Sequence, residues 1–269
     1  MIRPRVRSGV RLTPRRENRQ LPVPPEGLRV AVGPFADAET FLQSGRETLA
    51  LLTSLCELRP DHAVLDVGCG SGRVALPLTE YLSHSGSYVG FDPVAGLIQW
   101  CHTHITAQYP NFHFRHVDVH NASYHPEGRW PAAAIRFPCE PGSVDVALLT
   151  SVFTHLLPDD VAAYVRELRR VLRPGGRCLV SYLLMNDEAR AAVEAGTTIF
   201  DLQYRHGPYV SFSREHPTEG LAYDEVYALK TLREAGLAIE TVRYGTWRHI
   251  HSFAVEHDWV VARKPISAA

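Results

Sequence analysis

The sequence predicts an α/β fold in which a mostly parallel sheet is covered by helices. Two observations lead to this prediction. From residue 37 to residue 184, short apolar runs rich in β-branched residues alternate with longer stretches of helical periodicity, which is typical of strand–helix units. The first such run, residues 63–67, leads through a glycine-rich turn into a helical stretch from Arg73, and this brings bare backbone to a helix N-terminus.

The first half of the chain supplies three of the expected strands. Asp37 is placed as the N-cap of a helix over residues 37–58. Gly45 inside this helix costs about 1 kcal/mol against alanine, which indicates a close approach by another part of the chain. Strands are expected over 63–67, 88–92 and 112–118, with helices over 73–81 and 93–109 between them.

The second half continues this alternation and then departs from it. A fourth strand is expected over 143–150, followed by an amphipathic helix over 159–172 with acidic residues in its first turn and arginines in its last. A Pro-Gly-Gly sequence stops that helix before a fifth strand at 177–184. Residues 186–222 break the pattern, and a helix over 223–235 and an antiparallel pair at 237–244 and 257–263 complete the fold.

Composition excludes several classes of protein. The net charge is −1 over 269 residues and the pI is near 6.9, so the whole molecule carries no signature of nucleic-acid or membrane binding. Five scattered cysteines without a C-x-x-C pair argue for a reducing compartment and against disulfides or structural zinc. No apolar run reaches the roughly 18 residues of a membrane span, so a cytoplasmic protein is expected.

Three segments are set apart from the regular pattern. Residues 1–27 form an arm with seven arginines in its first nineteen positions and several prolines, expected to pack on its own domain or on a partner chain. Organelle targeting and nucleic-acid contact are the alternatives for this arm. Residues 28–269 form one domain, with inserted segments at about 120–142 and 186–222 over its active site. The first insert is long and rich in turn formers, which predicts an ordered flap.

The glycine turn carries the most specific motif. Its pattern is D-x-G-x-G-x-G, from Asp66 to Gly72, whereas a dinucleotide-binding turn would place its third glycine at position 73, which is an arginine here. A second strand ends in Asp92, twenty positions after Gly72. This combination resembles motif I and the following acidic residue of the class I S-adenosylmethionine (SAM)-dependent methyltransferases, and the resemblance covers about residues 37–184. It implies a Rossmann-like three-layer α/β/α fold with a seven-stranded, mostly parallel sheet whose last strand pair is antiparallel.

The resemblance also implies the cofactor, SAM, and the residues that contact it. Asp92 would hold the ribose, since an ionised carboxylate can accept from both hydroxyls of a diol. Asp118 would accept from the adenine amino group, with the Val119 backbone alongside. The full set of predicted cofactor contacts is Asp66, Gly68, Cys69, Gly70, Gly72, Arg73, Asp92, Pro93, Asp118, Val119, Thr150 and Ser151, with Phe41 and Gly45 from the helix before the motif.

The acceptor side of the site is expected after the fourth strand and in the second insert. An oxygen or nitrogen acceptor must lose a proton, and His155, just beyond the fourth strand, is the predicted catalytic base. Its alternative role is that of a buried or helix-capping histidine. Predicted substrate-wall residues are Phe153, Phe200, Tyr204, His206 and Tyr209, which could equally be core aromatics. No acidic pair follows the fourth strand, so no metal is predicted, and the absence of an N-P-P-Y or D-P-P-Y tetrapeptide there argues against methylation of adenine or glutamine amino groups.

These expectations define a leading function and its alternatives. The leading one is methylation of a hydroxyl on a small molecule, a sugar or a specialised metabolite of natural product biosynthesis. The alternatives are methylation of RNA or protein with the basic arm as a tether, and a non-catalytic SAM-fold binding subunit. A nicotinamide dehydrogenase is disfavoured by Arg73. The sequence leaves the acceptor and a homodimeric state open.

Overall fold

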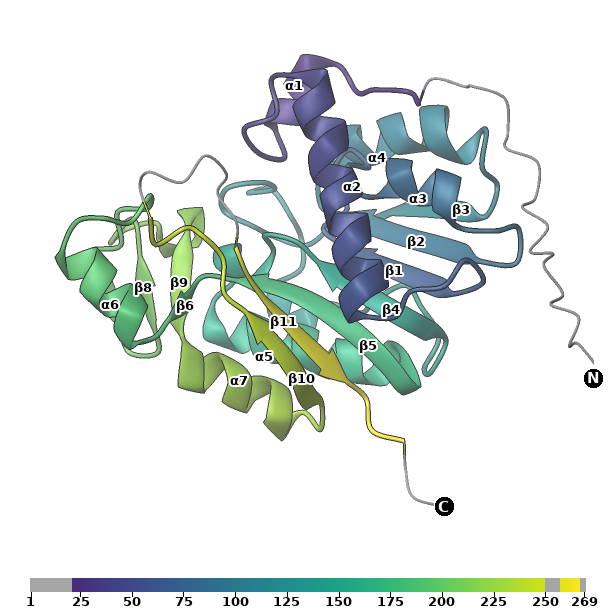
Figure 1. Ribbon diagram of the computed structural model, residues 1–269. Helices are drawn as coiled ribbons and strands as arrows, with labels where there is room; N and C mark the ends of the chain where they lie inside the picture. Colours follow the sequence, from purple (N-terminus) through teal and green to yellow (C-terminus); the bar gives the residue numbers. More distant parts are fainter. Residues whose placement is uncertain (1–20, 250–256, 267–269) are drawn as a thin grey trace, which may run out of the picture.

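The computed structural model describes residues 21–249 and 257–266, and it is built around one large sheet (Figure 1). The sheet has seven strands in the order β10-β11-β5-β4-β1-β2-β3. Their bounds are β1 Ala63–Val67, β2 Ser87–Asp92, β3 Phe112–His116, β4 Val144–Leu149, β5 Leu172–Tyr182, β10 Ala238–Arg243 and β11 Asp258–Arg263. Neighbouring strands from β3 to β5 pair in parallel, and β11 pairs antiparallel with both β5 and β10. The predicted Rossmann-like sheet is confirmed.

Helices cover both faces of this sheet. The helices α2 (Ala38–Leu55), α3 (Ala75–Tyr81) and α4 (Ala95–Cys101) lie on one face, and α5 (Pro158–Val171) and α7 (Glu225–Glu234) lie on the other (Figure 1). Successive residues of a strand point to opposite faces, so Val64 packs under the first group and Leu65 under the second. A short helix, α1 (Glu26–Val30), precedes α2.

Several boundaries differ from the predicted ones. The helix expected over 93–109 is α-helical only to Cys101 and continues as a π-helical turn over His102–Thr106. The Pro-Gly-Gly sequence lies inside β5, where Gly175 has a φ of 82° and the pairing with β4 shifts register between Val144 and Val146. Gly45 fits the close approach expected of it, because a Cβ at this position would overlap the backbone oxygen of Arg73.

The second insert forms a sheet of its own. Its four short strands are β6 (Leu184–Met185), β7 (Tyr204–His206), β8 (Tyr209–Ser211) and β9 (Leu221–Asp224), in the order β6-β9-β8-β7. The helix α6 (Asp187–Glu194) packs beside them, and an apolar cluster that includes Leu202 and Trp247 fills the space beneath. The short 3-10 helix η4 (Pro217–Glu219) reaches back to the end of β4, where it contacts the 3-10 helix η3 (Phe153–His155).

The first insert is folded against α5. Its second half, which includes η2 (Ala132–Ala134), is held by Glu167, whose carboxylate accepts from the backbone of Phe137 at 2.8 Å, and by Arg170, which donates to the carbonyls of Phe137 and Cys139. Its first half forms a tight turn between Asn121 and His125, beyond the end of β3. From here on, the flap means residues 120–130 alone, the first half of this insert.

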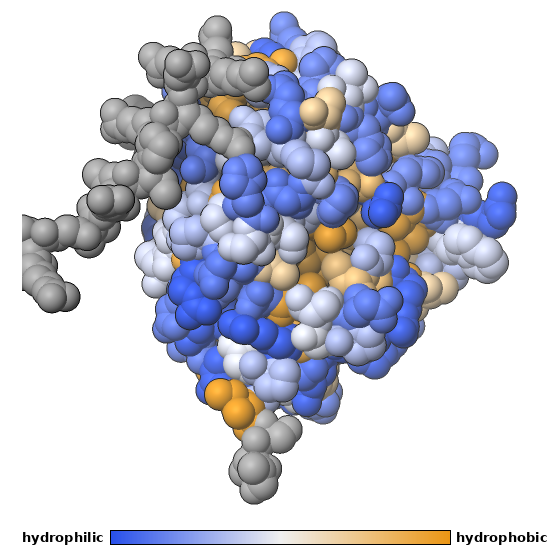
Figure 2. Space-filling view, turned by 90° about the vertical axis from the view of Figure 1, so that its right-hand side faces the viewer, coloured by the Kyte–Doolittle hydropathy of each residue, from blue (hydrophilic) through white to orange (hydrophobic). Residues whose placement is uncertain are grey.

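The edge strand β3 lies on the side of the molecule shown in Figure 2, which is mostly hydrophilic with smaller apolar areas. His113, Arg115 and His116 of this strand are exposed. Polar and charged side chains on an edge strand discourage pairing with another chain. No described helix has the length and apolar character needed to cross a membrane.

Candidate active site

The glycine turn after β1 is shaped by backbone conformations that favour glycine. Gly68, Gly70 and Gly72 have φ angles of 73°, 54° and 83°, in the left-handed region. A Cβ on Gly68 would lie 2.7 Å from a methyl of Val152, and one on Gly70 would lie 2.6 Å from a methyl of Val32. The missing side chains therefore let Val152 and Val32 pack directly against the backbone of the turn, at the end of a buried strand.

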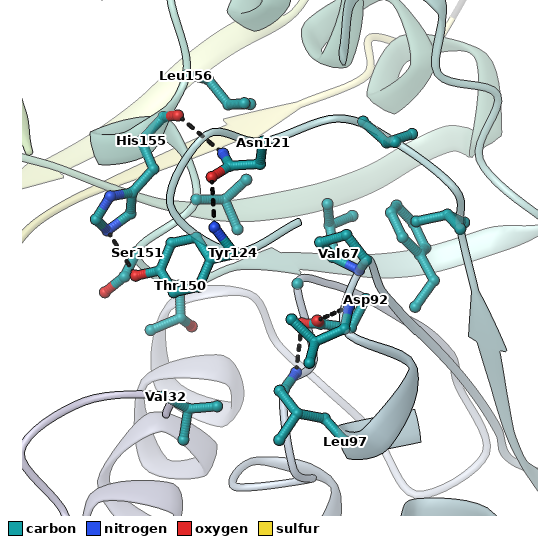
Figure 3. Close-up of a pocket in the computed structure, with 18 of the residues that line it drawn as sticks. Val32, Val67, Asp92, Leu97, Asn121, Tyr124, Thr150, Ser151, His155 and Leu156 are labelled. Atoms are coloured by element: carbon teal, nitrogen blue, oxygen red, sulfur yellow. Dashed lines mark hydrogen bonds between the residues drawn. The ribbon is translucent and has the colours of Figure 1, made fainter. Parts of the chain in front are cut away.

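Asp92, at the end of β2, faces this turn. Its side chain is 7% exposed, and its two oxygens accept from the backbone N–H groups of Gly70 at 3.0 Å and Val94 at 2.9 Å (Figure 3). Burial raises the pKa of Asp92, and the two backbone donors oppose that rise. Each carboxylate oxygen can accept more than one hydrogen bond, so the carboxylate keeps capacity for the two hydroxyls of a diol.

A partly open cavity of about 130 Å³ begins at Asp92 and extends to His155 (Figure 3). Next to Asp92 its walls are apolar, formed by Val94, Leu97, Val117 and Val119. At the far end the lining becomes polar. An apolar wall beside a diol-binding carboxylate suits a nucleoside, whose base is planar and largely desolvated when bound.

Two hydroxyl side chains mark the carboxyl end of β4. Thr150 lines the cavity, and its Oγ1 is buried without a hydrogen-bond partner among the described residues. Ser151 also lines the cavity, and its φ of 56° is rare for a residue other than glycine. Its backbone N–H donates to Ser181 Oγ at 2.7 Å, and its own Oγ lies 3.4 Å from Nε2 of His257. Buried polar atoms without partners and strained backbone are both common at ligand sites.

His155 closes the far end of the cavity from η3. Its Nδ1 lies 3.0 Å from the carbonyl oxygen of Thr218 in η4. A carbonyl can only accept, so Nδ1 carries the hydrogen and Nε2 of the neutral ring keeps a lone pair. Burial lowers the pKa of His155, with the Thr218 hydrogen bond opposing the effect, so the ring is neutral at pH 7. A neutral imidazole that lines the cavity with a lone pair on Nε2 is a proton acceptor.

The flap brings one more group to His155. The hydroxyl of Tyr124 lies 3.3 Å from His155 Nε2, and the two rings meet edge to face at 5.2 Å (Figure 3). Tyr124 lines the cavity although 43% of its surface is exposed. The sequence showed Tyr124 only as an aromatic residue of a long insert, and His257 only as the start of a strand. Neither had a motif that could reveal it.

The predicted cofactor contacts fall into two groups. Those that line the cavity are Gly68, Gly70, Asp92, Pro93, Val119, Thr150 and Ser151. Those that do not are Asp66, Cys69, Gly72, Arg73, Asp118, Phe41 and Gly45. A direct contact between the cofactor and any member of the second group remains a prediction.

Three charged residues of the second group have partners within the protein. Asp66 accepts from the Tyr88 hydroxyl at 2.7 Å behind the glycine turn, and burial raises its pKa to about 7. Arg73 donates to Ser44 Oγ at 2.8 Å and lies over the ring of Phe35. Asp118 accepts from His125 Nε2 at 3.1 Å and from the Arg129 backbone at 3.2 Å, so it holds the flap.

The predicted substrate-wall residues are not brought to the cavity. Phe153 is fully buried and packs against Tyr182. The other four belong to the small sheet: Phe200 stacks on Phe212, Tyr204 lies under Arg214, and His206 stacks on Tyr209. Tyr209 lines a separate cavity of about 190 Å³ beside Arg190. Within the described ranges there is no cluster of three or more His, Cys, Asp or Glu side chains arranged to hold a metal ion.

Comparisons with known proteins agree with this geometry. Residues 64–176 match a family model described as a methyltransferase domain. A 2-phytyl-1,4-naphtoquinone methyltransferase from Trichormus variabilis is 28% identical over 122 residues, which cover 45% of this chain and 47% of that protein. The matched part spans under half of the length of the curated relatives.

Solved structures share the fold at low identity. A SAM-dependent methyltransferase from Methanosarcina mazei superimposes with a TM-score of 0.52 and 19% identity, over 78% of this chain and 95% of that one. A Burkholderia thailandensis 1,6-didemethyltoxoflavin-N1-methyltransferase, solved with bound 1,6-didemethyltoxoflavin and S-adenosylhomocysteine (SAH), gives a TM-score of 0.54 and 18% identity over 91% and 93% of the two chains.

The cavity itself fits this cofactor. Gly68 and Gly70 line the cavity without side chains, Asp92 can accept from a ribose diol, and the Thr150 hydroxyl has no partner among the described residues. The family match over residues 64–176, the seven-stranded fold and this fit together support a class I SAM-dependent methyltransferase domain, with SAM as its cofactor.

Proposed function

We propose that this protein transfers the methyl group of SAM to a hydroxyl of a small molecule, such as a sugar or a specialised metabolite. The observation that carries the proposal is the neutral His155, which lines the cavity and keeps a lone pair on Nε2. A hydroxyl must lose its proton as it becomes an ether, and a positioned base contributes about 10²–10⁴-fold to such a step.

The protein's own residues would hold the cofactor. The backbone of Gly68 and Gly70 and the carboxylate of Asp92 offer contacts to its polar parts, and Leu97 and Val117 offer an apolar wall to its base. When bound, SAM supplies a methyl group on a positively charged sulfur, a leaving group that needs no further activation. Most of the remaining work is positioning, which can lower a barrier by roughly 7–11 kcal/mol.

His155 completes this arrangement by taking a proton at Nε2. Its Nδ1–H already donates to the Thr218 carbonyl, and that hydrogen bond supports the imidazolium that forms. Because the pKa of His155 lies below 6.5, the base stays neutral through pH 7. We expect kcat to be constant across neutral pH and to fall only below about pH 6.5.

The test is an acceptor screen with labelled SAM and the full-length protein. We expect transfer to phenols, sugars or other hydroxyl compounds, and a loss of about 10²–10⁴-fold in kcat for His155→Ala, with SAH binding within a few-fold of wild type. His113→Ala, on the exposed edge strand, is the matched control and should leave kcat unchanged. Labelling confined to RNA or protein, or a fully active His155→Ala, would contradict the proposal.

A further inference from the structure

Three separate segments meet at His155. The 3-10 helix η3 carries the ring, and η4 of the second insert supplies the Thr218 carbonyl to its Nδ1. The flap reaches the same residue through Asn121, whose side-chain nitrogen donates to the His155 carbonyl at 3.3 Å. The Asn121 carbonyl oxygen accepts from the backbone of Ser123 and Tyr124 at 3.0 and 3.1 Å. This turn fixes the backbone of Tyr124 beside the imidazole.

The Tyr124 hydroxyl lies between the base and the rest of the cavity. Its oxygen is 3.3 Å from His155 Nε2, the nitrogen that carries the lone pair, so the phenol donates and the imidazole accepts. Burial raises the pKa of Tyr124, and the charge of Asp92 adds to the rise, so the hydroxyl is protonated at pH 7. Tyr124 lines the same cavity as Asp92, the predicted ribose ligand, and His155, the predicted base.

This geometry restricts how a proton can reach His155. The lone pair on Nε2 already accepts a hydrogen bond from Tyr124. The hydroxyl of a methyl acceptor in the cavity would therefore donate its hydrogen bond to Tyr124 Oη and not to the imidazole. A phenol oxygen can accept one hydrogen bond while it donates another, which makes it able to pass a proton on. A phenylalanine at this position would give the same ring contact and none of this capacity.

Building on the proposed function, we propose that Tyr124 is a catalytic residue that relays the acceptor proton to His155. The acceptor O–H bond breaks as a new O–H bond forms on Tyr124 Oη, and the original Tyr124 O–H bond breaks as an N–H bond forms on His155 Nε2. The electron pair of the broken O–H bond stays on the acceptor oxygen and forms the new bond to the methyl carbon, while the electron pair of the broken S–CH3 bond stays on the sulfur of the departing SAH. Tyr124 ends as a neutral phenol, and the imidazolium releases its proton to water.

The decisive variant is Tyr124→Phe, which keeps the ring and removes the hydroxyl. We expect kcat for a hydroxyl acceptor to fall 10- to 100-fold, with KM for the acceptor and SAH affinity by calorimetry within about threefold. The double variant Tyr124→Phe with His155→Ala should be no slower than His155→Ala alone, because the two groups act in one relay. Tyr244→Phe is the matched control: Tyr244 is 47% exposed, and its hydroxyl donates to Glu225 outside the cavity.

A second readout needs no turnover. The Tyr124 hydroxyl donates to the neutral form of His155, so its removal should raise the pKa of His155, measured by NMR titration of the ring in apo protein. An unchanged pKa of His155, or a Tyr124→Phe variant with a kcat equal to or above that of wild type, would overturn the relay. The Tyr124 side chain would then only shield His155 from solvent. If wild type transfers no methyl group to any hydroxyl, the proposed function fails by itself, and the NMR titration still decides whether the Tyr124–His155 bond exists.

Discussion

Two carboxylates only 26 positions apart have different roles in this site. Asp92 lines the cavity and has acceptor capacity beyond its two backbone partners, whereas Asp66 lies behind the glycine turn on the Tyr88 hydroxyl. With a pKa of about 7, Asp66 is partly protonated at neutral pH. The uncharged amide of asparagine therefore resembles the state that Asp66 already populates. It does not resemble an ionised Asp92.

The first prediction compares these two residues by the same substitution. We expect Asp92→Asn to weaken SAH binding more than tenfold, because hydrogen bonds to a charged group are worth about 1.5–3 kcal/mol and the amide offers one acceptor oxygen in place of two. Asp92→Ala should weaken it at least as much. Asp66→Asn should stay within a few-fold of wild type. Calorimetric titration with SAH measures all three, and equal losses at positions 66 and 92 would show that the carboxylates act only through the shape of the turn.

At the scale of elements, a buried ion pair joins the large sheet to the small one. Arg248 and Asp258 are 1% and 0% exposed and lie 2.7 Å apart. Asp258 also accepts from the Trp247 indole at 2.8 Å and from the Leu184 backbone at 2.6 Å, while Arg248 donates to the Leu184 carbonyl at 3.1 Å. The start of β11, and with it the neighbouring His257, is therefore held against the junction of β5 and β6.

The second prediction follows from the burial of this pair. Asp258→Ala leaves the Arg248 charge buried and unpaired, which costs about 3–5 kcal/mol of unfolding free energy. Glu39→Gln breaks the exposed pair with Arg46 and should cost about 1 kcal/mol or less. Urea unfolding of the two variants measures the difference. A loss below 1 kcal/mol for Asp258→Ala would mean that water reaches the pair.

Element lengths explain what the sequence could predict. The strands of the large sheet and the helices beside them are long enough for periodicity to show, and the glycine spacing with Asp92 indicated the edge of the sheet where the cavity lies. The strands of the small sheet have two to four residues, too few for a pattern, and aromatics such as Phe200 and Tyr204, predicted for a substrate wall, lie outside the cavity that Asp92 lines. Tyr124 depends on the turn at Asn121, and its partner His155 is 31 positions away. Contacts of this kind leave no local signal.

At the scale of the whole molecule, buried titratable groups shape the response to acid. Burial lowers the pKa of His257 to about 4. Between about pH 6.5 and pH 4, His257 is therefore protonated in the unfolded chain and neutral in the folded chain. This lowers stability as pH falls, by up to roughly 3 kcal/mol. Asp66 acts in the opposite direction, because its raised pKa lets the folded chain take up a proton first as pH falls from about 7 toward 3.8.

The third prediction uses variants to separate these opposed effects. Between pH 7 and pH 4.5, His257→Gln should lose less unfolding free energy than wild type, because glutamine cannot be protonated in the unfolded chain. Asp66→Asn should lose more, because the variant lacks the carboxylate whose protonation in the folded chain offsets part of the loss. His113→Gln, which alters an exposed histidine, should follow the wild-type curve. Urea unfolding across this range measures the differences, and curves for His257→Gln and wild type that run parallel would contradict the burial of His257.

We propose that one cavity holds the cofactor at Asp92 and the acceptor at the Tyr124–His155 pair, and a crystal structure with SAH bound would show whether it does. We expect both ribose hydroxyls within about 2.7 Å of the Asp92 carboxylate oxygens, and the sulfur turned toward an open space beside Tyr124 Oη and His155. An SAH molecule bound elsewhere, or one whose sulfur points away from these two residues, would contradict it.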